Sequence, residues 1–141
     1  MSVARAVFPR APPARPVSAE ATASEERIVR LLAAAARGPE RDGLFALWLM
    51  VRAAEALCTR AAPSPRNHRR RLQALEARLA SLALPPPLAR ALAAARQHLE
   101  PATPEAAASV LAQLVAPTRE VLGPEAGEAV GIAARAVRIH L

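Results

Sequence analysis

A two-residue signal for the start of a helix recurs along this chain, and it constrains the fold more than any other feature. In this signal a cap residue is followed by proline at the first helical position. It occurs at Gly38-Pro39, Ser64-Pro65, Thr103-Pro104 and Gly123-Pro124. Proline fits there because the N–H of the first helical residue has no intrahelical partner, and because the proline φ angle is already helical. The recurrence predicts successive helices joined by short turns.

Two further marks complete the predicted helix boundaries. Thr22 and Glu25 have the spacing of a capping box, which indicates an earlier helix start. The run Pro85 to Pro87 indicates a stiff break before a leucine-containing segment. We therefore expect six helices, over residues 22–37, 39–60, 65–83, 87–100, 104–122 and 124–140.

Composition and periodicity favour an all-α fold. The chain has 37 Ala and 18 Leu but only 2% aromatic residues, which suits helices that pack through small side chains and disfavours sheets. Apolar residues recur at helical spacing in three stripes: Ile28-Leu31-Leu32-Ala35, Leu72-Leu75-Leu79-Leu82 and Leu88-Leu92-Ala95-Leu99. Residues 44–58 are apolar around the whole axis, Phe45 and Trp48 included, which predicts a central helix. The expected fold is a compact bundle of five to six helices.

The length of 141 residues suits one domain. We expect a single helical bundle over residues 22–141, preceded by a disordered basic tail over residues 1–21 that is rich in Pro, Ala and Arg. Four prolines within residues 9–16 oppose the amphipathic helix of a transit peptide. The longest apolar run, residues 44–51, is too short to cross a bilayer, so no membrane association is expected. A lone Cys58 and the absence of a signal sequence predict a cytoplasmic location.

The positive charge is concentrated in two places. Of the net charge of +7, residues 1–19 contribute +3 and residues 60–71 contribute +5, so the remaining residues sum to −1. All 19 basic residues are arginine, which together with abundant Ala and Pro indicates a GC-rich, bacterial genome. Four arginines lie at the predicted start of one helix: Arg66, Arg69, Arg70 and Arg71. There they add positive charge to the positive end of the helix dipole.

This cluster, called here the Arg66–Arg71 cluster, has three interpretations. The arginines are solvated or paired with acids of the preceding helix such as Glu40 or Asp42, or they contact an acidic protein, or they bind phosphates of a nucleic acid. The scarcity of aromatic residues for stacking on bases weighs against nucleic acid.

Gly127 and Gly131 form a second candidate contact surface. They are four residues apart in the last predicted helix, so they share a face on which a second helix backbone can approach closely. This face predicts either packing within the chain or contact between subunits.

The sequence contains no recognisable catalytic or metal-binding motif, so we expect no catalytic residues, no metal and no cofactor. Cys58 is predicted to be a buried structural thiol, and Glu55 to form an ion pair with Arg52 at the rim of the bundle. We expect a non-catalytic protein-interaction or assembly module with a protein partner or self-association. The alternative is a nucleic-acid-associated accessory protein that binds phosphates through the basic tail and the Arg66–Arg71 cluster.

Overall fold

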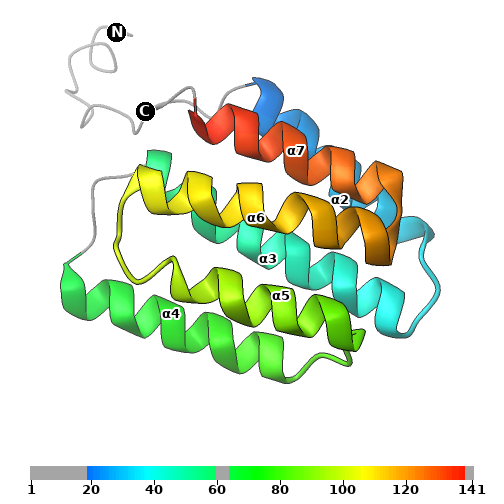
Figure 1. Cartoon of the computed structure of the whole chain (residues 1–141), viewed down its shortest axis with the longest axis horizontal. Coiled ribbons are helices and arrows are strands. Elements are labelled where there is room, and N and C mark those ends of the chain that lie inside the picture. The colour runs from blue at the N-terminus through cyan, green and yellow to red at the C-terminus, as the bar shows by residue number, and fades with distance from the viewer. Residues whose placement is uncertain (1–18, 60–63, 139–141) are drawn as a thin grey trace, which may run out of the picture.

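The structure, a computed structural model, describes residues 19–59 and 64–138 as six helices without a strand among them (Figure 1). The helices are α2 (Ala19–Ala34), α3 (Pro39–Thr59), α4 (Pro65–Ala80), α5 (Pro86–Gln97), α6 (Pro104–Leu122) and α7 (Pro124–Arg138). The predicted all-α bundle is confirmed. None of the described helices combines the length and apolar character needed to cross a membrane.

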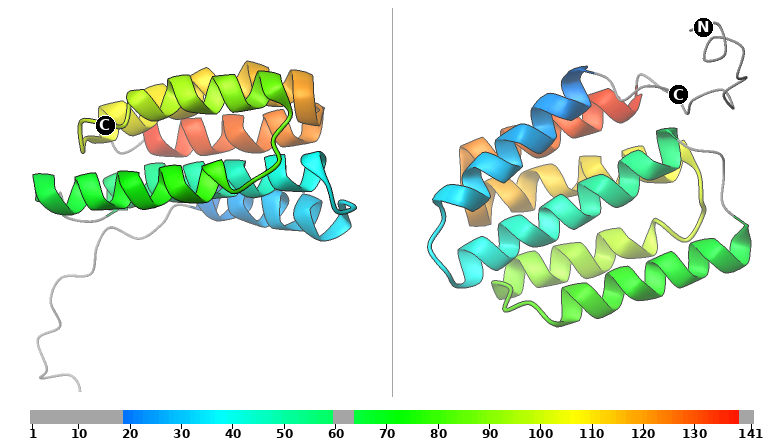
Figure 2. Two further views of the ribbon diagram at one scale, coloured as in Figure 1. Left: turned by 90° about the horizontal axis from the view of Figure 1, so that it is seen from below. Right: turned by 180° about the vertical axis from the view of Figure 1, so that it is seen from behind.

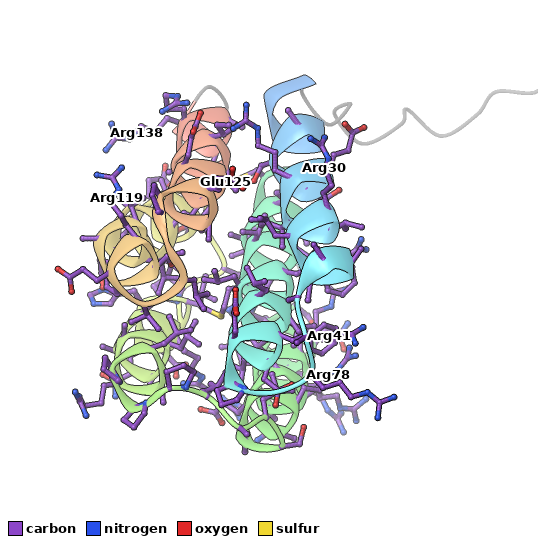
Figure 3. The ribbon with its side chains drawn as sticks, turned by 90° about the vertical axis from the view of Figure 1, so that its right-hand side faces the viewer. Arg30, Arg41, Arg78, Arg119, Glu125 and Arg138 are labelled. Atoms are coloured by element: carbon purple, nitrogen blue, oxygen red, sulfur yellow. The ribbon has the colours of Figure 1, made fainter. Side chains whose placement is uncertain are left out.

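The helices form two layers of three. Helices α2, α3 and α4 make one layer, and α5, α6 and α7 make the other (Figures 1 and 3). Consecutive helices run in opposite directions, and the chain crosses between layers at the turn from α4 to α5 (Figure 2). Helix α2 therefore faces α7, α3 faces α6, and α4 faces α5. Each layer has an inner face toward the core and an outer face toward solvent.

The four cap–proline signals all begin helices, for local reasons that the structure makes explicit. The hydroxyl oxygen of Ser64 accepts a hydrogen bond from the Asn67 N–H at 3.2 Å, and that of Thr103 accepts one from the Ala106 N–H at 3.1 Å. These bonds satisfy backbone donors that the first turn leaves without an intrahelical acceptor. Gly38 and Gly123 have φ angles of 135° and 101°, which L side chains rarely adopt.

The first helix begins earlier than the sequence predicts. Helix α2 starts at Ala19, so Thr22 lies within the helix and the predicted capping box is wrong. The Ala-Glu-Ala segment before Thr22 has high helix propensity and extends the helix backward. The predicted tail therefore does not reach residue 21, and residues 1–18 lie outside the described part of the chain.

Helices α2, α4 and α5 each end three residues before their predicted ends, and the predicted ends of α3 and α7 lie outside the described residues. Helix α4 stops at Ala80, where the Ser81 hydroxyl donates to the Arg78 carbonyl at 2.7 Å, and α5 stops at Gln97. These side-chain and 3₁₀-type bonds close the last turn. Helix α7 is described to Arg138, and residues 139–141 lie outside the described part of the chain.

The core divides into two clusters of different composition. The leucine cluster joins α3, α4, α5 and α6, and its largest members include Leu47, Met50, Leu88, Leu92, Leu99 and Leu114. The alanine cluster joins α2, α3, α6 and α7, and includes Ile28, Ala54, Ala107, Ala129, Ala133 and Val137. The predicted central helix α3 contributes to both clusters.

Side-chain size sets how closely the helices approach. Helices α6 and α7 have the most extensive close backbone contact, followed by α2 and α7. The Ser24 hydroxyl, which is fully buried, even reaches the Ala129 carbonyl of α7 and donates to it at 2.7 Å. Helix α4 makes no comparably close backbone contact with any described helix, because it packs through leucine side chains.

Candidate anion-binding site

The Arg66–Arg71 cluster lies in the first two turns of α4, at one end of the bundle. Burial of His68, Leu72 and Leu75 fixes which face of α4 packs on the core. All four arginines of the cluster are exposed on the remaining faces. With Arg78 and the single acid Glu76, they give α4 a net charge of +4, the highest of the described helices.

The acids predicted as partners of these arginines lie elsewhere. Because α3 and α4 are antiparallel, the start of α4 lies beside the end of α3, whereas Asp42 lies near the α3 start (Figure 1). The Asp42 carboxylate accepts a hydrogen bond from the Ala83 N–H at 2.8 Å, just beyond the opposite end of α4. Among the residues that the structure describes, no ion pair joins Glu40 or Asp42 to the cluster.

His68 anchors the cluster to the rest of the bundle, a role that its position among arginines did not predict. Its Nε2 atom lies 2.6 Å from the Leu99 carbonyl oxygen, and the imidazole is buried. Since a carbonyl oxygen only accepts, Nε2 must carry the proton and donate it. An ion pair between Arg96 of α5 and Glu76 of α4, at 2.7 Å, adds a second link farther along. Side chains, rather than close backbone contact, therefore hold α4.

A row of guanidinium groups and aromatic rings lies beside this helix, on the outer face of α3. The Phe45 and Trp48 rings are stacked, with centroids 5.7 Å apart and an interplanar angle of 21°. The guanidinium carbon of Arg52 lies 4.9 Å from the Trp48 ring centroid, and that of Arg78 in α4 lies 5.7 Å from the Phe45 centroid. We call Arg52, Trp48, Phe45 and Arg78 the guanidinium–aromatic stack. At these distances the ring quadrupoles attract the cations.

This stack was not predicted, because both rings belong to a segment that is apolar around its whole axis, which favours burial in the core. In the structure Phe45 and Trp48 are half-buried. A signal was available in the spacing of Arg41, Phe45, Trp48 and Arg52, which places all four on one helical face. Because arginines mark both ends of that face, it must reach solvent.

Glu55 lies inside the bundle rather than at its rim. Glu55 is only 8% exposed, and the Arg52 guanidinium lies over the Trp48 ring. Burial, reinforced by the nearby Glu25 carboxylate and opposed by Arg52, raises the pKa of Glu55 to about 7. An acid with such a pKa is suited to proton exchange near neutral pH.

Cys58, one turn away, is a buried thiol as predicted. Burial, with smaller effects from the Glu55 and Glu105 carboxylates, raises the pKa of Cys58 to about 11. The thiol also contacts the Ala54 carbonyl at 3.6 Å. Because the thiolate is the reactive form, Cys58 is a poor nucleophile at neutral pH. No three His, Cys, Asp or Glu side chains within residues 19–59 and 64–138 form a group able to hold a metal ion.

The two glycines of α7 have different surroundings. A Cβ atom on Gly127 would lie 2.8 Å from the Cβ of Arg119, so this glycine allows α7 to contact α6 of the same chain. A Cβ atom on Gly131 would meet nothing closer than the Arg135 guanidinium at 3.9 Å. Self-association through the glycine face of α7 therefore stays a prediction. Gly131, and not Gly127, is the glycine available for it.

Comparison of the chain with protein-family models, with curated proteins and with solved structures gave no match.

Proposed function

We propose that this protein is a non-catalytic interaction module that binds an acidic partner through the Arg66–Arg71 cluster. The observation that carries the proposal is the exposure of four neighbouring arginines on a helix of charge +4. The described residues provide no acid that pairs with them. Such a concentration of one sign of charge attracts and orients a partner of the opposite sign.

The position of the cluster supports this role. Each arginine costs about 0.3–1 kcal/mol beside the positive end of the helix dipole when it is exposed and unpaired. A bound anion relieves that cost, and guanidinium groups bind carboxylates and phosphates through paired hydrogen bonds. The outer side of α4 is free of close backbone neighbours among the described helices, so a partner has access to it. We further propose that binding takes place in the cytoplasm, where a lone thiol is stable.

The test compares two triple variants of the full chain on immobilised heparin, a sulfated polyanion. Arg66, Arg69 and Arg70 are changed to Ala in the first variant. The matched control changes Arg90, Arg135 and Arg138, which are exposed on the opposite layer. Each variant lowers the formal net charge from +7 to +4. We expect the first to elute at much lower salt than the wild type and the control to elute near it. Equal losses in both variants would show a response to total charge and would refute the proposed site.

A further inference from the structure

An open groove lies between α2 and α3, on the outer face of the layer formed by α2, α3 and α4. It has a volume of about 530 Å³. Its lining is Glu25, Glu26, Val29, Arg30, Ala33, Trp48 and Arg52. Val29 is 51% exposed and is the one large apolar side chain in the described residues with such exposure. An apolar wall with a ring, two guanidinium groups and two carboxylates around it is suited to a flat ligand.

The guanidinium–aromatic stack continues this groove toward α4. Arg52 and Trp48 line the groove, and Phe45 and Arg78 extend the row across the α3 surface. Contact with the rings orients the two guanidinium groups before any ligand arrives. A guanidinium that rests on a ring keeps its N–H donors available for phosphate and can also stack on a base.

This face carries arginines both within the groove and beyond it. Arg30, Arg41 and Arg78 project from the side of the molecule formed by α2, α3 and α4, opposite to Arg119 and Arg138 (Figure 3). None of these three, nor Arg52, forms an ion pair with another described residue. Glu25 and Glu26, in the middle of α2, also line the groove, so its two arginines are matched by two acids, and Arg41 and Arg78 lie outside it.

We propose that this face binds single-stranded nucleic acid, with a base stacked at Arg52 and Trp48 and with phosphates on Arg30 and Arg78. The inference deepens the proposed function, on which it rests, by naming the acidic partner. A single strand offers unpaired base faces together with phosphates, whereas a duplex hides its base faces. Carboxylates of an acidic protein would satisfy the arginines but make no use of the ring at the groove wall.

Trp48 is the only tryptophan of the chain, so its fluorescence reports on this groove directly. The full chain is titrated with an oligothymidylate of about 15 nucleotides, a length within the site sizes of single-strand binding folds. We expect quenching of Trp48 emission, with an affinity that falls as salt rises. An oligouridylate of equal length shows whether DNA or RNA binds better. Duplex DNA and polyglutamate are the competing polyanions, and neither is expected to quench comparably.

Arg52→Lys separates stacking from charge. Lysine keeps the positive charge but lacks the planar group, so we expect roughly tenfold weaker binding, the size of one lost stacking contact. Arg138→Gln, on the opposite layer, is the matched control and should leave affinity and quenching nearly unchanged. Unaltered circular dichroism of Arg52→Lys would show that its fold is intact.

The other outcomes overturn the inference in distinguishable ways. If oligothymidylate binds without quenching, Arg52→Lys matches the wild type, and the Arg66/Arg69/Arg70 variant abolishes binding, the stack is refuted while the proposed function stands. If polyglutamate quenches as strongly as oligothymidylate, the partner is an acidic protein. Tighter binding of duplex than of single strand also refutes the inference. If no polyanion binds, the proposed function fails with it.

Discussion

The two halves of the bundle pack in opposite ways. Around α7, alanines and Gly127 bring helix backbones into close contact, and a serine on α2 reaches a backbone carbonyl of α7. Around α4, leucines hold helices at a greater distance, and His68 and Glu76 supply polar links. Where helix backbones are in close contact, there is no space for an added methyl group. Where leucine side chains separate the helices, removing side-chain atoms leaves a cavity.

This difference in packing affects where the molecule can carry a binding surface. Helix α4 is attached mainly by side chains on one face, so its other faces tolerate a high density of charge. Helix α7 has nine buried residues and few positions left for a binding surface. The Arg66–Arg71 cluster lies accordingly on the loosely packed side of the molecule.

The largest expected effect is truncation of a leucine in the leucine cluster. Leu92 of α5 is almost completely buried, and Leu92→Ala should lower the free energy of unfolding by about 2–5 kcal/mol, because a cavity remains. Urea unfolding measures the change. Val29→Ala, at an exposed site on α2, is the control and should cost less than about 0.5 kcal/mol. A loss below about 1 kcal/mol for Leu92→Ala would mean that this interface collapses easily around cavities.

Adding one methyl group should have the opposite sign at the two glycines of α7. Gly127→Ala places a Cβ 2.8 Å from the Arg119 Cβ, so the helices must separate, at a cost of about 1–3 kcal/mol. Gly131→Ala meets open space and should stabilise the fold by up to about 1 kcal/mol through helix propensity. Thermal unfolding of both variants checks the pair. Stabilisation by both substitutions would show that α6 and α7 can move apart at little cost.

Glu55 should make stability depend on pH. Its pKa of about 7 in the folded protein exceeds the ordinary value of 4.5, so folding favours the protonated acid. The contribution is fully present below pH 4.5 and is lost as the pH rises through 7. Glu55→Gln cannot titrate, so its unfolding midpoint should exceed that of the wild type at pH 8 but match it near pH 4.5. A constant difference between the two proteins across this range would contradict the assignment.

The smallest effect concerns the attachment of α4. His68→Phe keeps a buried ring but removes the donor to Leu99, at a cost of about 0.5–1.5 kcal/mol. Amide hydrogen exchange should accelerate in α4 and stay unchanged in α7, because α4 opens locally. His98→Ala, at the exposed end of α5, is the control and should change neither helix. Equal acceleration in α4 and α7 would show that the bundle opens as one unit.

The helices were largely predictable because their signals are local. A cap residue before proline fixes a helix start through bonds within one turn, as Ser64 and Thr103 show. The start of α2 escaped prediction because the Thr22–Glu25 spacing was interpreted as the cap, whereas the Ala-Glu-Ala segment before it is also helical. The all-α class followed from composition and the apolar stripes.

The surface was less predictable because it depends on which helices become neighbours. An apolar pattern around the whole of α3 does not reveal that Phe45 and Trp48 face outward, or that Arg78 arrives from another helix. The burial of Glu55 likewise depends on Glu25 and α2 lying beside it. The positions of the four clustered arginines were clear from the sequence, but the separation of Asp42 from them required the antiparallel arrangement of α3 and α4.

The pairing of α2 with α7, of α3 with α6 and of α4 with α5 has a consequence for the order of folding. The α4–α5 pair joins neighbouring segments, whereas the Ser24–Ala129 hydrogen bond between α2 and α7 spans 105 residues. Because closing a long loop costs more entropy, the α4–α5 pair should assemble first and the α2–α7 seam last. Ser24→Ala, which removes the α2–α7 hydrogen bond, should then change mainly the unfolding rate, while substitutions at Leu92 slow folding, which a chevron plot would separate. The contact between the first and last described helices would thus set how long a completed structure stays folded.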